Sequence, residues 1–93
     1  MHRVKRLVLD VLKPHTPNVL DFSRHLAEHG SHRVKTCVVE MDDKTETLQL
    51  VIEGEDIDFE GIQQAISENG ASLHSIDEVE IEGSETEADA DSD

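Results

Sequence analysis

The sequence predicts a single α+β domain in which four strands and two helices follow one another in the order βαββαβ. Three observations indicate this class: strand-like runs of Val, Leu and Ile, helix-like apolar stripes between them, and turn residues at the boundaries. A chain of 93 residues has the length of one domain. Because it contains two Phe and neither Tyr nor Trp, we expect an aliphatic core.

The first strand is predicted over residues 3–12, and alternation divides it into two faces. One face carries Leu7, Leu9 and Val11, and the other carries Val4, Arg6, Val8, Asp10 and Leu12. The segment KPHTP stops this strand, and we expect Thr16 to cap a helix with Pro17 at its first position. The apolar stripe of that helix consists of Val19, Phe22 and Leu26. Gly30 is expected to end the helix.

Two further strands, over 33–41 and 46–53, are predicted to form a hairpin with a short polar loop. Asp58 is the expected N-cap of the second helix, which ends at the Asn-Gly pair 69–70. The stripe of this helix consists of Phe59, Ile62, Ala65 and Ile66. A fourth strand is predicted over 73–81.

The two halves of the chain echo each other, since LAEHG at 26–30 and ISENG at 66–70 both end a predicted helix. Right-handed crossovers then give a four-stranded antiparallel sheet in the order 4-1-3-2 with both helices on one face. This is the ferredoxin-like arrangement. We expect it to span residues 1–82, and we expect 83–93, GSETEADADSD, to be a disordered acidic tail.

Charge is distributed unevenly along the chain. Eight basic and six acidic residues give the first 44 residues a net charge of +2, whereas the remaining 49 carry sixteen acids and no base, a net charge of −16. This balance, with few aromatic residues, argues against a nucleic-acid partner. It is also typical of proteins from salt-accumulating halophiles, where concentrated KCl shortens the Debye length to about 3 Å at 1 M.

Two further observations bear on location. No apolar run approaches the roughly 18 residues of a membrane span, so we expect no membrane partner. The single Cys37 has no second cysteine to pair with, and no cleavage site of small residues follows the basic start. We therefore expect a cytoplasmic protein.

The predicted strand order places the basic and the acidic residues on opposite edges of the sheet. One outer strand carries Arg33 and Lys35, and the opposite outer strand carries Asp77, Glu78, Glu80 and Glu82. Unpaired edges are templates for pairing, so we expect a homo-oligomer through these edges, with a ring if the rotation closes. We also expect a neighbour to cover the helix-free face, on which we place Val4, Val8, Leu12, Val34, Val38 and Val51. The alternative is a monomer with ordinary charged edges.

Carboxylates predict a cation site at one end of the sheet. With the first and third strands as parallel neighbours, Asp10 and Glu53 are expected side by side on the helix-free face. The turn GEDIDFE adds Asp56 and Asp58, and His15 and His74 are expected at the same end. Oxygen ligands of this kind suit calcium or magnesium, although the spacing is not that of an EF-hand loop. The structural alternative is that Asp58 only caps its helix and that Arg6 neutralises the strand carboxylates.

The sequence contains weaker signals for zinc binding and for catalysis. His25 and His29 stand four residues apart on a predicted helix, a spacing able to bind zinc, but no third ligand is fixed by the sequence. We therefore interpret them as exposed histidines on a polar helix face. No serine lies in a nucleophile elbow, and no glycine-rich loop is present to hold a phosphate. We predict that the protein is not an enzyme.

Three segments carry a resemblance to a known family. They are RLVLDVLKPH at 6–15, IEGEDIDFEGI at 52–62 and HSIDEVE at 74–80. In order and spacing they resemble the archaeal family called domain of unknown function 211. The resemblance implies a ferredoxin-like fold and ring-forming oligomers, allows a bound divalent cation, and implies no assigned activity. The candidate metal or interface positions that the resemblance implies are Asp10, His15, Glu53, Asp56, Asp58, His74, Asp77 and Glu78.

We therefore expect a non-enzymatic homo-oligomer that binds calcium or magnesium at a carboxylate cluster. One alternative is a small-molecule-sensing regulatory module with its ligand at the junction of two subunits. Another is an enzyme in which Asp10 and Glu53 act as an acid/base pair with pKa values split by mutual repulsion.

Overall fold

A computed structural model describes residues 2–29 and 32–83 and contains one sheet with two helices. The elements are β1 (His2–Pro14), α1 (Val19–Ala27), β2 (Arg33–Met41), β3 (Thr45–Glu53), α2 (Phe59–Glu68) and β4 (Ser72–Gly83). The predicted βαββαβ order is confirmed, and the strand ends differ from the predicted ones by at most two residues. The predicted helix end at Gly30 and all but the first residue of the predicted tail lie outside the described residues.

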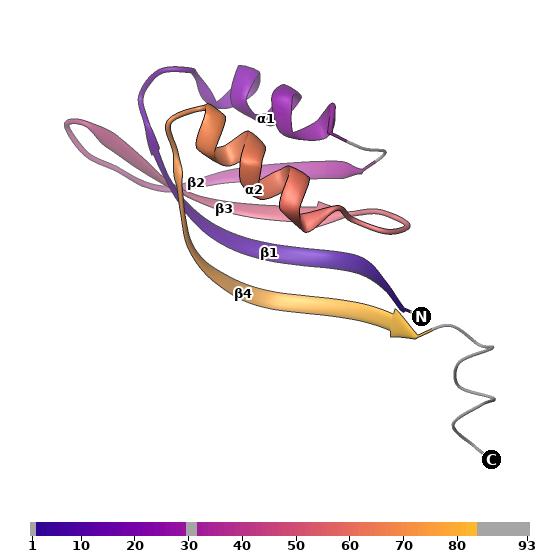
Figure 1. Cartoon of the computed structure of the whole chain (residues 1–93). Helices are drawn as coiled ribbons and strands as arrows, with labels where there is room; N and C mark the ends of the chain where they lie inside the picture. Colours follow the sequence, from indigo (N-terminus) through magenta and orange to yellow (C-terminus); the bar gives the residue numbers. More distant parts are fainter. Residues whose placement is uncertain (1, 30–31, 84–93) are drawn as a thin grey trace, which may run out of the picture.

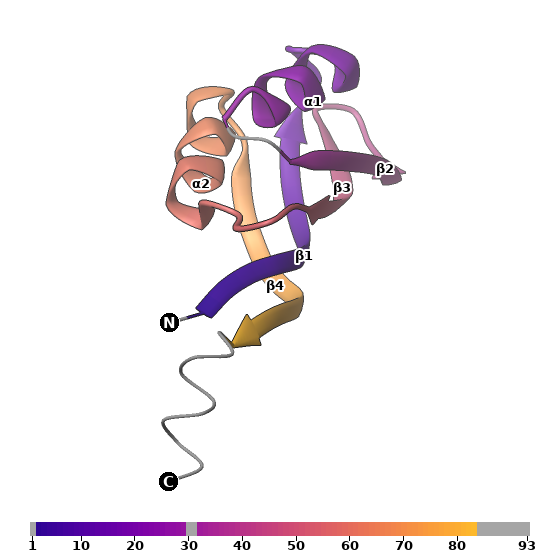
Figure 2. The ribbon, with the colours of Figure 1, turned by 90° about the vertical axis from the view of Figure 1, so that its right-hand side faces the viewer.

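The four strands form one antiparallel sheet in the order β2-β3-β1-β4, as predicted. Both helices cover the same face of this sheet, and Figure 1 shows them side by side above β1 and β3. Turned by 90°, the molecule shows a helical layer and a sheet layer, with β2 and β4 on the outside (Figure 2). The architecture is ferredoxin-like.

The core lies between these two layers and is aliphatic apart from Phe22, which is fully buried. Alternate residues of the two central strands form the sheet side of the core: Leu7, Leu9, Val11, Leu48, Leu50 and Ile52. The two helices form the opposite side of the core: Phe22, Leu26, Ile62, Ala65 and Ile66. Burial of the apolar stripe of each helix, and of one face of the two central strands, provides the hydrophobic stabilisation that the sequence pattern predicts.

The helix termini correct one prediction and confirm another. Asn18, not Thr16, is the N-cap of α1, because its extended backbone lets its side chain accept a hydrogen bond of 2.8 Å from the Asp21 N–H. Asp58 caps α2 as predicted and accepts from the Gly61 N–H at 3.2 Å. After α2 the chain turns at Gly70, whose φ of +77° is a conformation that favours glycine.

The helix-free face is less apolar than predicted. Val34 lies opposite Ile52, and Val38 lies opposite Leu48, so both point toward the helices. Val4 also packs against the helix-side core. The expectation that these three valines face away from the helices is therefore wrong. For Val34 and Val38, alternation shows that they share a face but not which face that is. Val4 leaves the face of Arg6 where the pairing of β1 with β4 shifts register between Val4 and Arg6.

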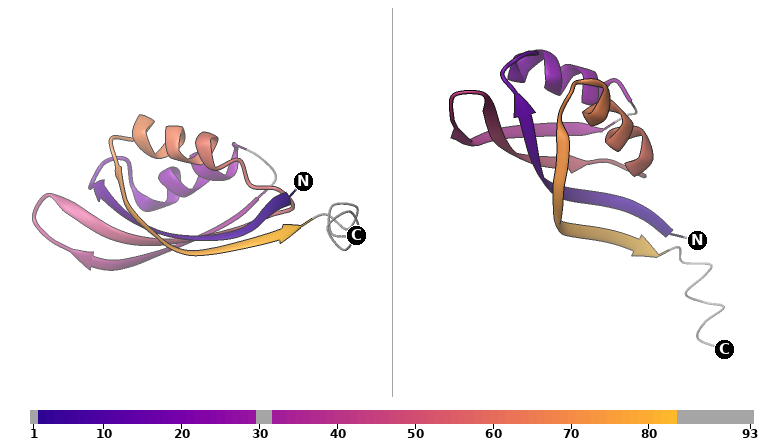
Figure 3. Two further views of the ribbon diagram at one scale, coloured as in Figure 1. Left: turned by 60° about the horizontal axis from the view of Figure 1, so that its bottom comes forward. Right: turned by 60° about the vertical axis from the view of Figure 1, so that its left-hand side comes forward.

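β1 and β4 extend together beyond the helices toward the two ends of the chain (Figure 3). Along this stretch the loop after β3 follows β1, with the Gly54 N–H donating to the Lys5 carbonyl at 3.1 Å and the Ile57 N–H to the Val4 carbonyl at 2.8 Å. These bonds hold the acidic turn after β3 against the start of β1. Within residues 2–29 and 32–83, neither helix has the length and apolar character needed to cross a membrane.

Candidate functional site

The side chains predicted to form a cation site do not gather at one end of the sheet. β1 runs antiparallel to β3, so Pro14 at the end of β1 lies opposite Thr45 at the start of β3. His15 and His74 consequently lie toward one end of β1, and the turn after β3 lies at the other end. The prediction of a single cluster is wrong because it required the first and third strands to be parallel.

Asp10 and Glu53 are not neighbours. Arg6 is the β1 residue opposite Glu53, whereas Asp10 lies opposite Gln49. Four residues along a strand correspond to about 13 Å. The two carboxylates therefore have different surroundings and do not form the expected acid/base pair.

Arg6 holds two of the predicted carboxylates in an ion-pair network on the helix-free face. Its guanidinium lies 2.9 Å from Glu78 and 2.6 Å from Glu53, and Glu53 also pairs with Arg33 at 3.1 Å. The bonds to Glu78 and then to Glu53 raise the pKa of Arg6. This network crosses all four strands and neutralises Glu53, as the structural alternative predicted.

The turn after β3 uses its acids for backbone contacts. Asp56 accepts from the Val4 N–H at 3.3 Å, and Asp58 is committed to the cap of α2. Both bonds fix the turn against its neighbours, so the structural interpretation of Asp58 is confirmed.

One predicted pair does meet. Asp10 Oδ2 lies 3.6 Å from His74 Nδ1, at a small hollow of about 90 Å³ that Leu12 and Thr47 also line. Asp77 lies in the same strand as His74 but accepts from the Ser75 hydroxyl at 2.7 Å.

A calcium or magnesium ion does not fit these residues within one subunit. Such ions take six or more oxygen ligands, whereas Asp10 and His74 supply one carboxylate and one imidazole. The other predicted carboxylates are separated from them, and Glu53 and Glu78 are paired with arginine. Cation binding at these residues stays a prediction, and it requires further oxygen ligands from water or from a second subunit.

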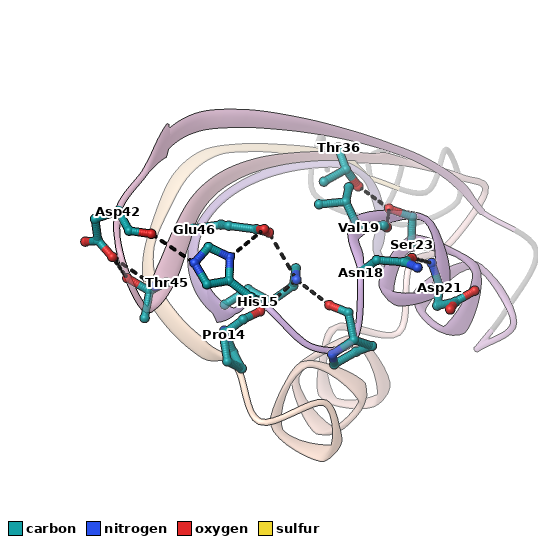
Figure 4. A network of polar contacts seen from close by, with 12 residues as sticks. Pro14, His15, Asn18, Val19, Asp21, Ser23, Thr36, Asp42, Thr45 and Glu46 are labelled. Atoms are coloured by element: carbon teal, nitrogen blue, oxygen red, sulfur yellow. Dashed lines mark hydrogen bonds and ion pairs between the residues drawn. The ribbon is translucent and has the colours of Figure 1, made fainter.

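Beside the start of α1, the structure contains a buried charged network that was not predicted from the sequence (Figure 4). Lys13 is fully buried and lies 3.0 Å from the Glu46 carboxylate. Its ammonium also donates to the Pro14 carbonyl at 2.7 Å and to the Pro17 carbonyl. With one ion pair and two hydrogen bonds, Lys13 ties the turn before α1 to the start of β3.

His15 closes this network on its outer side. Its Nδ1 lies 3.1 Å from Glu46, and its Nε2 lies 2.9 Å from the Asp42 carbonyl. With an acceptor at each nitrogen, the charged ring satisfies both contacts, and the bonds to Glu46 and then Asp42 raise the pKa of His15. Burial alone would raise the pKa of Glu46, but the bonds from His15 and Lys13 lower it.

A signal for this network was present in the sequence. Lys13 falls on the alternation face of Leu9 and Val11, and Glu46 falls on that of Leu48. A basic and an acidic residue on core-facing positions of neighbouring strands indicate a buried pair, because lone buried charges are strongly disfavoured.

The raised pKa of His15 predicts a pH dependence. Its contribution to stability is fully present below the unfolded pKa near 6.5 and is lost as pH rises through the higher folded-state value. We expect the difference in unfolding free energy between wild type and His15→Asn to be largest near about pH 5.5 and to shrink toward about pH 8.5. Urea unfolding at several pH values measures it. A difference that stays constant over this range would contradict the assignment.

The two outer strands carry opposite charges and exposed apolar side chains. β2 pairs only with β3 and β4 only with β1, so each has one unpaired edge within the part of the chain that the structure describes. The exposed apolar residues of these strands are Val38, Val39, Met41, Ile76, Val79 and Ile81. Lys35 on β2 and Glu80 on β4 have no ion-pair partner among the described residues.

A wider hollow of about 520 Å³ lies on the β2 side of the sheet. Three cationic side chains, those of Arg6, Arg33 and Lys35, line it together with Val51 and Glu53. In a chain with a net charge of −14, this is a local concentration of positive charge beside an unpaired edge.

Comparison with known proteins agrees with the sequence segments singled out above. The profile of the family DUF211, described as "Uncharacterized ArCR", matches residues 5–90. An uncharacterized protein of Methanocaldococcus jannaschii is 41% identical over 80 residues, which cover 85% of this chain and 82% of that protein. The chain therefore belongs to the DUF211 family.

Proposed function

We propose that this chain works as a non-enzymatic homo-oligomer in which the β4 edge of one subunit docks on the β2 edge of the next. The observation that carries this proposal is the pairing of opposite charge with exposed apolar surface on the two unpaired edges. Ile76, Val79 and Ile81 on β4 are about half exposed, at 47%, 50% and 54%. Such surface on an edge strand favours association unless it is protected.

Charge complementarity selects the partner. Two β4 edges repel each other, since this strand carries Asp77, Glu78, Glu80 and Glu82 and neither lysine nor arginine. A β4 edge next to a β2 edge instead brings Glu80 toward Lys35. A contact between unlike edges is head-to-tail, and it generates a ring when the rotation closes.

The predicted calcium or magnesium is proposed to act at this junction. Within one subunit the predicted ligands are dispersed, whereas at the junction β2 of the next copy would add its one carboxylate, Glu40, to the exposed acids of β4. The enzyme alternative with Asp10 and Glu53 is not proposed, because the strand register separates these side chains.

Charge reversal tests the edge contact. We expect wild type to form an oligomer, and Arg33→Glu/Lys35→Glu to have the mass of a 10.4 kDa monomer. Light scattering or sedimentation measures the mass, with and without calcium or magnesium after removal of bound metal by a chelator. We expect the monomer because the reversed charges of β2 would face the acids of β4, and like charges at about contact distance cost several kcal/mol.

Two further variants sharpen this test. Arg24→Glu/Lys44→Glu changes the net charge by the same amount at α1 and the hairpin loop, and we expect it to keep the wild-type mass. Adding Asp77→Lys/Glu80→Lys to the edge variant exchanges the charges of both edges and should restore assembly. A monomeric wild type, or an edge variant of unchanged mass, would reject the proposal.

A second candidate function, small-molecule sensing at the subunit junction, is favoured by the hollow of about 520 Å³. Its three cationic side chains suit a small anion such as a carboxylate or phosphate. A ligand that binds only the folded state raises the melting temperature. A thermal-shift screen of small anions, repeated on Lys35→Gln, tests this function, and no shift with any anion would count against it.

A further inference from the structure

We propose that His25, His29 and Glu68 form a zinc site that joins α1 to α2. The sequence places the two histidines one helical turn apart, and the fold adds the missing third ligand from the last residue of α2. One donor atom from each of the three side chains lies within 4.8 Å of the others. The two rings are tilted by 57°, with centroids 5.0 Å apart.

Two of the separations between the donor atoms match a tetrahedral centre. His25 Nε2 lies 3.3 Å from His29 Nε2 and 3.6 Å from Glu68 Oε1. Zinc binds nitrogen and oxygen at about 2.0–2.2 Å, which places neighbouring ligand atoms of a tetrahedron roughly 3.3–3.6 Å apart. Three protein ligands leave the fourth position for water.

The electrostatic surroundings favour a cation at this point. His25 lies in the last turn of α1, His29 follows the end of that helix, and Glu68 is the last residue of α2. Carbonyl groups at helix C-termini carry partial negative charge, so two helix ends contribute here. The carboxylate of Glu68 adds a full negative charge.

Asn69 is in position to orient His25. In this structure its Nδ2 donates to His25 Nδ1 at 2.7 Å and to the Ala65 carbonyl at 2.7 Å. Zinc at Nε2 requires the proton on Nδ1, and a half-turn of the Asn69 amide places Oδ1 where it accepts that proton's hydrogen bond. The rotation gives up the bond to Ala65, so zinc binding is coupled to a local change at the end of α2.

The donor set separates this site from the predicted calcium or magnesium site. Two imidazoles and one carboxylate suit zinc, whereas calcium and magnesium prefer oxygen ligands. None of the three residues belongs to the edges of β2 and β4. The zinc proposal therefore stands independently of the proposed oligomer.

Calorimetric titration with a zinc salt tests the site on the full chain after treatment with a chelator and removal of the chelator. We expect one zinc ion per chain. Glu68→Gln should weaken binding by about tenfold or more, and His25→Ala/His29→Ala should abolish it. Glu60→Gln removes the same charge from the other end of α2 and serves as the matched control with unchanged binding.

A second readout keeps the test independent of heat signals. Cobalt in place of zinc should give the visible absorption typical of four-coordinate nitrogen and oxygen ligands in wild type and lose it in the double histidine variant. Circular dichroism checks that the variants keep their helices, and Glu68→Gln serves if the double variant does not fold. Absence of zinc binding in wild type, or equal binding by wild type and Glu68→Gln, would overturn the proposal.

Discussion

Replacing Glu46 with leucine is expected to lower the free energy of unfolding by about 3–5 kcal/mol. The substitution leaves the ammonium group of Lys13 fully buried without an opposite charge. It also removes the acceptor for His15 Nδ1. Urea unfolding at one fixed protein concentration measures the effect, because an oligomer would make stability depend on concentration.

The double variant Lys13→Met/Glu46→Leu distinguishes pairing from packing. Replacing a buried ion pair by apolar residues of similar volume is often neutral, so we expect this variant to recover most of the lost stability. Glu55→Leu, at an exposed position of the turn after β3 and outside the two proposed docking edges, is the matched control and should change stability by less than about 0.5 kcal/mol. A double variant as unstable as Glu46→Leu would show that the unpaired ammonium is not the cause.

Replacing Phe22 with alanine is expected to cost about 3–5 kcal/mol. Phe22 is fully buried in the cluster that joins α1 to the central strands. A small domain with an aliphatic core has little to fill the cavity that such a truncation leaves. Urea or thermal unfolding, followed by circular dichroism, measures the loss.

Leu20→Ala provides the control on the same helix. Leu20 is 60% exposed, so its truncation removes little buried surface and should change stability by about 0.5 kcal/mol or less. Because alanine has a higher helix propensity than either residue, equal losses for Phe22→Ala and Leu20→Ala would contradict core packing at Phe22 as the cause of its loss.

The elements of the fold could be predicted because local patterns determine them. Phe22 and Leu26 share the apolar stripe of α1, and Asp58 caps α2 by accepting a hydrogen bond from Gly61. Both features are present as predicted. The cap of α1 could not be resolved in the same way, since Thr16 and Asn18 are both capping residues. Only the backbone conformation and the bond to Asp21 distinguish them.

The candidate sites depended on contacts between distant segments. Asp10 and Glu53 were correctly assigned to neighbouring strands, but those strands, predicted to be parallel, are antiparallel. That error changes which residue of one strand lies opposite each residue of the other. His25 and His29 had the spacing of metal ligands, yet their third partner, Glu68, lies in another helix. A sequence gives the spacing within an element and leaves open which side chain of another element lies opposite.

By itself the sequence determined the βαββαβ order, the strand order of the sheet and membership in the DUF211 family. Local periodicity, turn residues and crossover handedness are sufficient for the two orders, because each acts over a few residues or over one connection. The family membership rests instead on the resemblance of the segments at 6–15, 52–62 and 74–80. Only the tertiary structure decided that Lys13 pairs with Glu46, that Arg6 joins Glu53 to Glu78, and that the valines at 34 and 38 face the helices. Those contacts follow from strand register and helix placement, which packing of the whole chain determines.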